Sequence, residues 1–268
     1  MKQSVTQNSQ KYIRDELLQN VLDLLDADDG KTFAEKKKYI VDYIQEWANG
    51  PHGDTTEEIA QKEQLGETIN QEFWKKEKEI TLENGITMRR VQQSDHKGYF
   101  AIQQAYSATA YMLKNPAYCD MLWNEHISSK GLTMTILRYG NYIGYCGINN
   151  ILKENWEIGI ELLPEYTGQG VGYCAISKML NEIHERLGRD FFIARIDPRN
   201  IASQKLFEKL GALPDGITAD WTENESIMLQ CEEEHLDQID EELINIAKKF
   251  NVAPRKLLSH VLKYSLKI

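Results

Sequence analysis

The feature that most constrains this chain is a run of glycines between a strand-like segment and a helix-like segment. The sequence from Trp156 to Tyr173 is WEIGIELLPEYTGQGVGY, with glycines at positions 168, 170 and 172. Glycine lets the backbone turn tightly and approach a ligand closely. The first N–H groups of a helix are unpaired and attract anions. The pattern is therefore typical of a pyrophosphate-binding turn, although such turns also serve packing alone.

Two common nucleotide motifs fit this stretch poorly. A P-loop requires a Lys followed by Ser or Thr after the second glycine, and neither residue follows here. A dinucleotide fingerprint requires GxGxxG at the start of a parallel sheet. This chain has GxGxG spacing, and the segments before it indicate antiparallel strands.

The composition narrows the function classes. The 268 residues carry a net charge of −10, which argues against nucleic-acid binding because phosphate contacts need a basic surface. The four cysteines and six histidines form no metal-ligand spacing, so we expect reduced thiols and no metal. No apolar run is long enough to predict a signal peptide or a membrane span. The expected location is the cytoplasm.

The order of local patterns predicts an α+β fold with a mixed, mainly antiparallel sheet. A Gly-Asn turn at 140–141 indicates a hairpin. Strand-like patterns cover 86–91, 132–138, 142–148, 156–163, 191–196 and a stretch near 226–229. Helical patterns cover 98–113, 117–128, 176–187, 201–210, 240–250 and 254–264.

These patterns divide the chain into three parts. We expect a helical domain over residues 1–80, where apolar residues recur at helical spacing. The α+β domain covers 81–230. A helical appendage covers 231–268, which begins with acids and ends with basic residues. The sequence does not specify what the two flanking parts do.

A second motif follows the glycine loop by about thirty residues. It is PRNIASQKLFEKLGA, from Pro198 to Ala212, at the end of a strand and the start of a helix. Together the two motifs resemble the GNAT acetyltransferase superfamily over about residues 84–230. The phrasing of the glycine loop is most similar to the branch of ribosomal-protein N-terminal acetyltransferases, which also includes enzymes that act on small amines.

The resemblance implies acetyl-CoA as co-substrate. Its pyrophosphate would be held by the loop, and its pantetheine arm would lie along the strand at 156–163. Asn200 and Ser203 would contact the arm or its phosphate from the other side. The loop residues implied in binding are Gly168 and the backbone N–H groups of Gln169, Gly170, Val171 and Gly172.

The resemblance also implies direct attack by an amine, which needs a base because an ammonium cannot attack. Glu157 stands where the family often has that carboxylate, and Glu161 lies on the same strand face. Glu157 is the first candidate and Glu161 the second; either is equally explained as a solvated carboxylate. The N–H of Leu162 would stabilise the developing oxyanion.

Two positions depart from the family pattern. Thr167 replaces the usual Arg or Gln of the loop, which places the affinity for CoA in doubt. Phe207 stands where many members have a tyrosine that protonates the departing thiolate, and it cannot donate a proton. Turnover would then be slower or lost.

The resulting function is transfer of an acetyl group to a primary amine. The acceptor is a protein N-terminus, an aminoglycoside or another small cationic amine. The alternative is a weak or inactive GNAT-derived binding protein that uses its helical flanks to engage a partner. The oligomeric state stays open, and a homodimer is one option.

Overall fold

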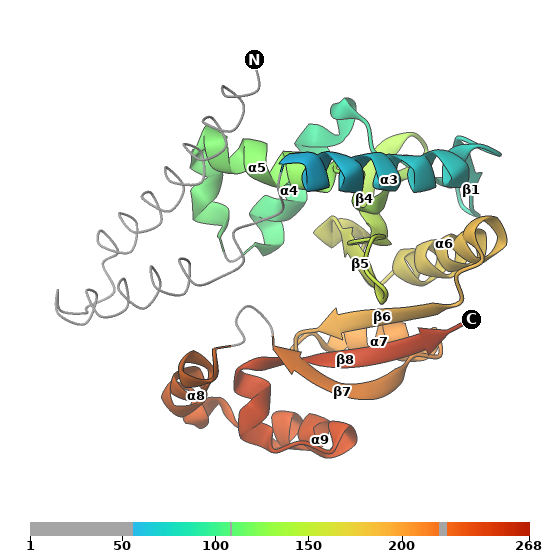
Figure 1. Ribbon diagram of the computed structural model, residues 1–268. Helices are drawn as coiled ribbons and strands as arrows, with labels where there is room; N and C mark the ends of the chain where they lie inside the picture. The colour runs from blue at the N-terminus through green and yellow to red at the C-terminus, as the bar shows by residue number, and fades with distance from the viewer. Residues whose placement is uncertain (1–55, 108, 220–223) are drawn as a thin grey trace. The chain divides into compact units, whose positions relative to one another are not determined.

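Eight strands form one mixed sheet in the computed structural model, which describes residues 56–268 except 108 and 220–223 (Figure 1). Residues 62–268 belong to one compact unit. The spatial order is β1-β2-β3-β4-β5-β6-β8-β7, with β5 and β6 parallel and all other neighbours antiparallel. The strands are β1 (Glu79–Thr81), β2 (Ile86–Arg90), β3 (Leu132–Arg138), β4 (Asn141–Ile148), β5 (Trp156–Leu162), β6 (Phe191–Ile196), β7 (Leu213–Ala219) and β8 (His260–Lys267).

Helices flank this sheet and connect its strands. The helices are α3 (Thr56–Trp74), α4 (His96–Tyr106), α5 (Pro116–His126), α6 (Val171–Leu187), α7 (Ile201–Lys209), α8 (Glu225–Glu234) and α9 (Glu241–Phe250). Short 3₁₀ turns are η1 (Gln93–Asp95), η2 (Ala110–Lys114), η3 (Pro164–Tyr166), η4 (Leu236–Gln238) and η5 (Pro254–Leu258). The described helices include none that is long and apolar enough to cross a membrane.

The predicted fold class is confirmed, and so is the hairpin. Tyr139 and Gly140 connect β3 to β4 with φ angles of 50° and 79°, the left-handed conformations that a two-residue hairpin turn requires. The apolar face predicted on α6 is buried in the core, with Ile176, Leu180 and Ile183 at most 1% exposed. The helices expected before residue 56 lie outside the described residues.

Two predicted elements are wrong. The segment near 226–229, expected as a strand, belongs to α8, because the Asn224 side chain accepts hydrogen bonds from the N–H groups of Ser226 and Ile227 and caps the helix. The strand in this part of the chain is β7, which the sequence analysis missed. Pro214 and Gly216 interrupt the alternation of apolar residues that usually marks a strand.

The helix expected over 254–264 is a 3₁₀ turn followed by β8. Its apolar residues fit a helical spacing at first sight, but Leu262, Tyr264 and Leu266 alternate and are all buried. The helix expected over 98–113 is also shorter. It ends at Tyr106, because Ser107 is extended, and the chain continues into η2.

Strand β8 lies between β6 and β7, so the segment expected as a helical appendage contributes an interior strand. Figure 1 shows these three strands side by side, with α8 and α9 in the connection between β7 and β8. The division of the chain into domains remains a prediction.

A buried carboxylate joins α8 to η5. Glu232 is 0% exposed and contacts Arg255 Nε at 2.8 Å, Lys256 Nζ at 2.9 Å and Ser259 Oγ at 2.9 Å. Burial alone would raise the pKa of Glu232, but the hydrogen bonds outweigh it and the pKa is lowered. The carboxylate therefore stays ionised in the folded protein near neutral pH.

We expect Glu232→Gln to lower the free energy of unfolding by about 2 kcal/mol near neutral pH, because two cations lose their buried acceptor. A lowered folded-state pKa contributes stability above the unfolded pKa, and that stability is lost as pH falls through the folded value. The difference between wild type and variant in urea unfolding should thus shrink at low pH. Glu233→Gln, at an exposed neighbouring residue, is the control; equal losses for both would contradict the prediction.

The feature that positions the site is the divergence of β5 from β6. The two strands pair only at Trp156–Phe192 and Glu157–Ile193. Beyond Glu157, no described strand pairs with this edge of β5. The sheet is therefore open along residues 158–162, next to the loop that leads into α6.

Candidate active site

The glycine loop has the geometry of an anion site. Gly168 and Gly170 have φ angles of +70° and +80°, and a Cβ built on either would meet no atom within 4 Å. Gly170 is the N-cap of α6, and no side chain caps this helix. The first-turn N–H groups therefore have no capping side chain, and they lie at the positive end of a 17-residue helix. This geometry is compatible with an anion at the loop, and the pyrophosphate contact expected from the sequence stays a prediction.

The third glycine has a packing role. A Cβ on Gly172 would lie 3.3 Å from Leu206 Cδ2, so its absence lets α6 approach α7 closely. Gln169 is exposed in the loop. Its Nε2 donates to the Glu165 carbonyl at 2.5 Å, and its Oε1 accepts from Arg138 Nη1 at 3.2 Å.

Asn200 and Ser203 lie at the start of α7. Asn200 Oδ1 accepts from the Ser203 N–H at 3.0 Å, so this amide is the N-cap of the helix. Ser203 is three residues before Leu206 and shares its face of α7, which is the face toward Gly172. The structure thus brings Ser203 to the side of α7 that faces the start of α6.

The N–H of Leu162 points to the open edge of β5. Leu163 N–H donates to the Ile143 carbonyl on β4 at 2.9 Å. Because successive N–H groups of a strand point to opposite edges, the Leu162 N–H faces away from β4. β6 does not pair with this residue. Within the part of the chain that the structure describes, this N–H therefore has no strand partner where the sheet opens.

The two candidate bases have different surroundings. Glu157 lies where β5 and β6 still pair, and its Oε2 is 3.2 Å from Arg195 Nε. The guanidinium of Arg195 also donates to the Ala219 carbonyl. Glu157 is therefore part of an ion pair between the start of β5 and the end of β6.

Glu161 lies at the open end of β5, opposite Tyr145 of β4. Burial raises the pKa of Glu161, and a hydrogen bond with the Tyr145 hydroxyl lowers it in part, so the net pKa is above the ordinary value. Gln103 Nε2 of α4 is 3.4 Å from Glu161 Oε2. A carboxylate with a raised pKa is a better proton acceptor than an ordinary one.

Aromatic rings surround this face of the sheet. Tyr99, Trp123, His126 and Tyr145 form a connected cluster, with the His126 ring 4.1 Å from that of Tyr99 and 4.5 Å from that of Tyr145. Burial lowers the pKa of His126 to about 4, so its ring is neutral near neutral pH. The ring Nε2 is buried without a hydrogen-bond partner among the described residues.

The sequence analysis did not point to Tyr145, Gln103 or His126. The hairpin turn could have led to Tyr145, because it fixes where β4 begins. Once β4 and β5 are placed antiparallel, their alternation puts one β4 residue opposite Glu161. Phe207 is buried in the core at 3% exposure and supplies no hydroxyl, as expected from its side chain.

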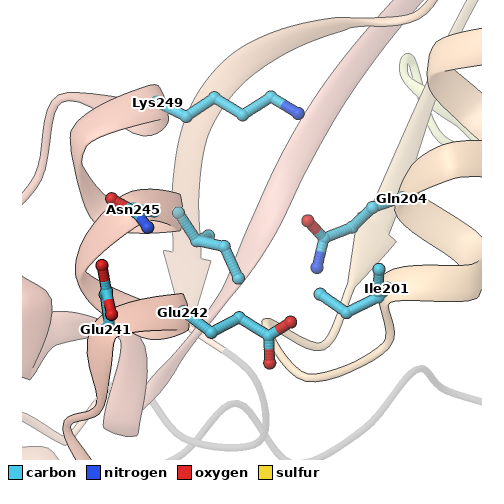
Figure 2. Close-up of a pocket in the computed structure, with 7 residues that line it drawn as sticks. Ile201, Gln204, Glu241, Glu242, Asn245 and Lys249 are labelled. Carbon is cyan, nitrogen blue, oxygen red and sulfur yellow. The ribbon is translucent and has the colours of Figure 1, made fainter.

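Two surface cavities lie away from Glu161 and the glycine loop. One of about 360 Å³ includes Glu157 and Arg195. The other, of about 490 Å³, lies between α7 and α9 (Figure 2). Its Glu242 and Lys249 pair with charged residues of α7 or the loop before it. We interpret this second cavity as a gap between packed helices.

The comparisons with known proteins agree with this geometry. Residues 86–213 match the family model described as "Acetyltransferase (GNAT) domain". No curated protein matches the chain. The chain therefore carries a GNAT acetyltransferase domain over residues 86–213.

Solved structures share the fold at low identity. The microcin C7 self-immunity acetyltransferase MccE, in complex with acetyl-CoA and AMP, is 15% identical with a TM-score of 0.51, covering 71% of this chain and 97% of that chain. RimJ from Mycobacterium smegmatis, in complex with CoA-disulfide, is 15% identical with a TM-score of 0.45, covering 68% and 81%. A ribosomal-protein-S5-alanine acetyltransferase from Vibrio fischeri is 16% identical with a TM-score of 0.47, covering 70% and 96%.

Proposed function

We propose that the chain transfers an acetyl group from acetyl-CoA to a primary amine, with Glu161 as the general base. The observation that carries the proposal is that three features lie within residues 161–172. They are the glycine loop before a helix without a side-chain cap, the unpaired edge of β5, and a carboxyl group whose pKa is raised. MccE, which has the same fold, was solved with acetyl-CoA.

The loop supplies the binding end of the site. The N–H groups from Gln169 to Gly172 hold the pyrophosphate, and Asn200 and Ser203 flank it from α7. The pantetheine arm lies along the open edge of β5. Acetyl-CoA, when bound, supplies the acetyl group as a reactive thioester.

The open edge supplies the chemistry. The Leu162 N–H donates to the thioester oxygen as negative charge develops on it. Glu161 precedes Leu162, and its carboxylate removes the proton from the acceptor ammonium so that the nitrogen can attack. Phe207 supplies no proton, so in this proposal the thiolate leaves unassisted or takes a proton from water.

Distance favours Glu161 over Glu157. Five residues separate Glu157 from Leu162, which is about 16 Å along a strand at about 3.3 Å per residue. A base has to lie within hydrogen-bond reach of the amine, directly or through one water. Glu157 is also held by Arg195. Glu157 remains the second candidate.

The proposed acceptor is an amine, and Glu161 alone does not determine which class of amine it is. Glu161 and the surrounding tyrosines favour a cationic group near the reacting nitrogen. A protein N-terminus, an aminoglycoside and a small polyamine-like cation all satisfy this requirement.

The test is calorimetry with acetyl-CoA followed by an amine panel. Binding near 1 μM corresponds to about −8 kcal/mol. Release of free CoA that depends on one amine of the panel would support the enzyme. Binding without release for every amine class would favour a binding protein that uses its flanking segments. Absence of both binding and thermal stabilisation would contradict the proposal.

The pH dependence tests the base separately. Since only the ionised carboxylate accepts a proton, kcat should rise with pH through a value above the ordinary pKa of a glutamate. Tyr145→Phe removes the hydrogen bond that lowers this pKa, so the acidic limb should move to higher pH. Tyr142→Phe is the control, because the Tyr142 hydroxyl has no hydrogen-bond partner among the described residues. If the acidic limb of the kcat profile lies at the same pH in wild type and Tyr145→Phe, Glu161 is excluded as the titrating group.

A further inference from the structure

Arg138 is a cation placed beside the glycine loop. It is the last residue of β3, and its Nη1 is 3.2 Å from the Oε1 of Gln169 in the loop. The sequence analysis did not single it out, because thirty residues separate it from the loop. The sheet brings the two together.

The hairpin geometry fixes this placement. β4 begins directly after the hairpin turn and runs antiparallel to β5, with Gly144 opposite Leu162. The start of β4 therefore lies at the end of β5 that continues into the loop. The turn itself is anchored, because the Tyr139 N–H donates to the Gly85 carbonyl at 2.7 Å. Arg138 thus lies at the end of a strand, next to a turn that is held by a backbone hydrogen bond.

The charge of Arg138 has no local counter-charge. Among the described residues, no carboxylate lies within 4.0 Å of its guanidinium, whereas Arg89, Arg90, Arg195 and Arg199 all pair with one. The chain as a whole carries a net charge of −10. An arginine without a carboxylate partner next to an uncapped helix start points to an anionic ligand.

The loop itself lacks a cation. Thr167 stands where the family pattern has Arg or Gln, and the loop from Thr167 to Gly170 contains no charged side chain. Backbone N–H groups provide direction for a pyrophosphate but only partial charges. A guanidinium adds a full charge and several donors in one plane, which suits two phosphate oxygens.

We propose that Arg138 donates to the pyrophosphate of CoA and so replaces the cation that Thr167 does not provide. This inference rests on the proposed use of acetyl-CoA. One Nη of the guanidinium stays on Gln169, which holds the side chain over the loop, and the remaining N–H groups contact the phosphate oxygens. Gln169 is a positioning residue in this arrangement.

The experiment measures the dissociation constants of CoA and of dephospho-CoA by calorimetry, without turnover. Wild type is compared with Arg138→Ala, Arg138→Lys and Gln169→Ala. Lys153→Ala is the matched control, since it removes one exposed positive charge from the β4–β5 connection at the opposite end of these strands. The melting temperature of each variant reports whether it folds.

We expect Arg138→Ala to weaken both ligands by about tenfold and Arg138→Lys by about threefold. Lys153→Ala should bind as wild type does. The salt dependence of binding should be weaker in Arg138→Ala, because a charge contact has been removed. Gln169→Ala should cost less than Arg138→Ala.

Two results would overturn the proposal while leaving the use of acetyl-CoA intact. One is equal affinity of Arg138→Ala and Lys153→Ala for both ligands. The other is a loss confined to CoA, which would place the contact at the 3′-phosphate. No binding of CoA by the wild type would overturn the proposed function as well, so the two failures are distinguishable.

Discussion

Replacing Glu161 by Gln should lower kcat at least about 100-fold and leave the dissociation constant of acetyl-CoA unchanged. General base catalysis contributes about 10²- to 10⁴-fold to the rate. Glutamine keeps the shape of the side chain but cannot take a proton from an ammonium near neutral pH. The measurement is steady-state release of free CoA with the best amine of the panel, together with calorimetry on the same variant.

Glu157→Gln is the matched control, because it changes the same functional group on the same strand face. We expect its kcat to stay within about fivefold of wild type, since Glu157 lies at the paired end of β5 and is held by Arg195. A large loss in Glu157→Gln with a small loss in Glu161→Gln would reverse the assignment. Small losses in both would mean that neither carboxylate is the base.

Gly170→Asp should weaken acetyl-CoA binding more than 100-fold. The new carboxylate would stand at the N-cap of α6, where the pyrophosphate is proposed to bind. Two unit charges about 4 Å apart repel by about 4 kcal/mol near a protein surface, and each 1.4 kcal/mol is tenfold in affinity. Calorimetry and the shift in melting temperature with ligand both report the loss.

Gly188→Asp controls for backbone strain in the same helix. Gly188 is the C-cap of α6, has a φ of +69° and would also meet no atom within 4 Å of a Cβ. Both variants therefore place Asp in a left-handed conformation, but only one puts the charge at the glycine loop. Equal loss of binding in the two variants would show that the loop does not hold the phosphates.

The parts of the fold that follow local rules were predictable from sequence. The glycine loop, the β3–β4 turn and the buried face of α6 each depend on residues close together in the chain. β8 was mistaken for a helix because its strand character depends on burial between β6 and β7, which a local pattern does not report. α8 was mistaken for a strand because its cap, Asn224, was not weighed.

The candidate site divides in the same way. The loop residues and the two carboxylates could be proposed from the sequence because they lie in one stretch of it. Their ranking could not be predicted, because it depends on other parts of the fold. Burial raises the pKa of Glu161 despite the hydrogen bond from Tyr145, and Arg195 engages Glu157. Arg138 was missed for the same reason, since only the register of β4 with β5 places it near the loop.

The position of β8 has a consequence for how the protein is made. β8 leaves the ribosome after both of its neighbours, about forty residues behind β7. Until it arrives, β6 and β7 each present an unpaired edge, and such edges template association with other chains. The helices α8 and α9 have to fold in the meantime. Substitutions that slow their folding would therefore lower the yield of native protein while leaving its equilibrium stability intact.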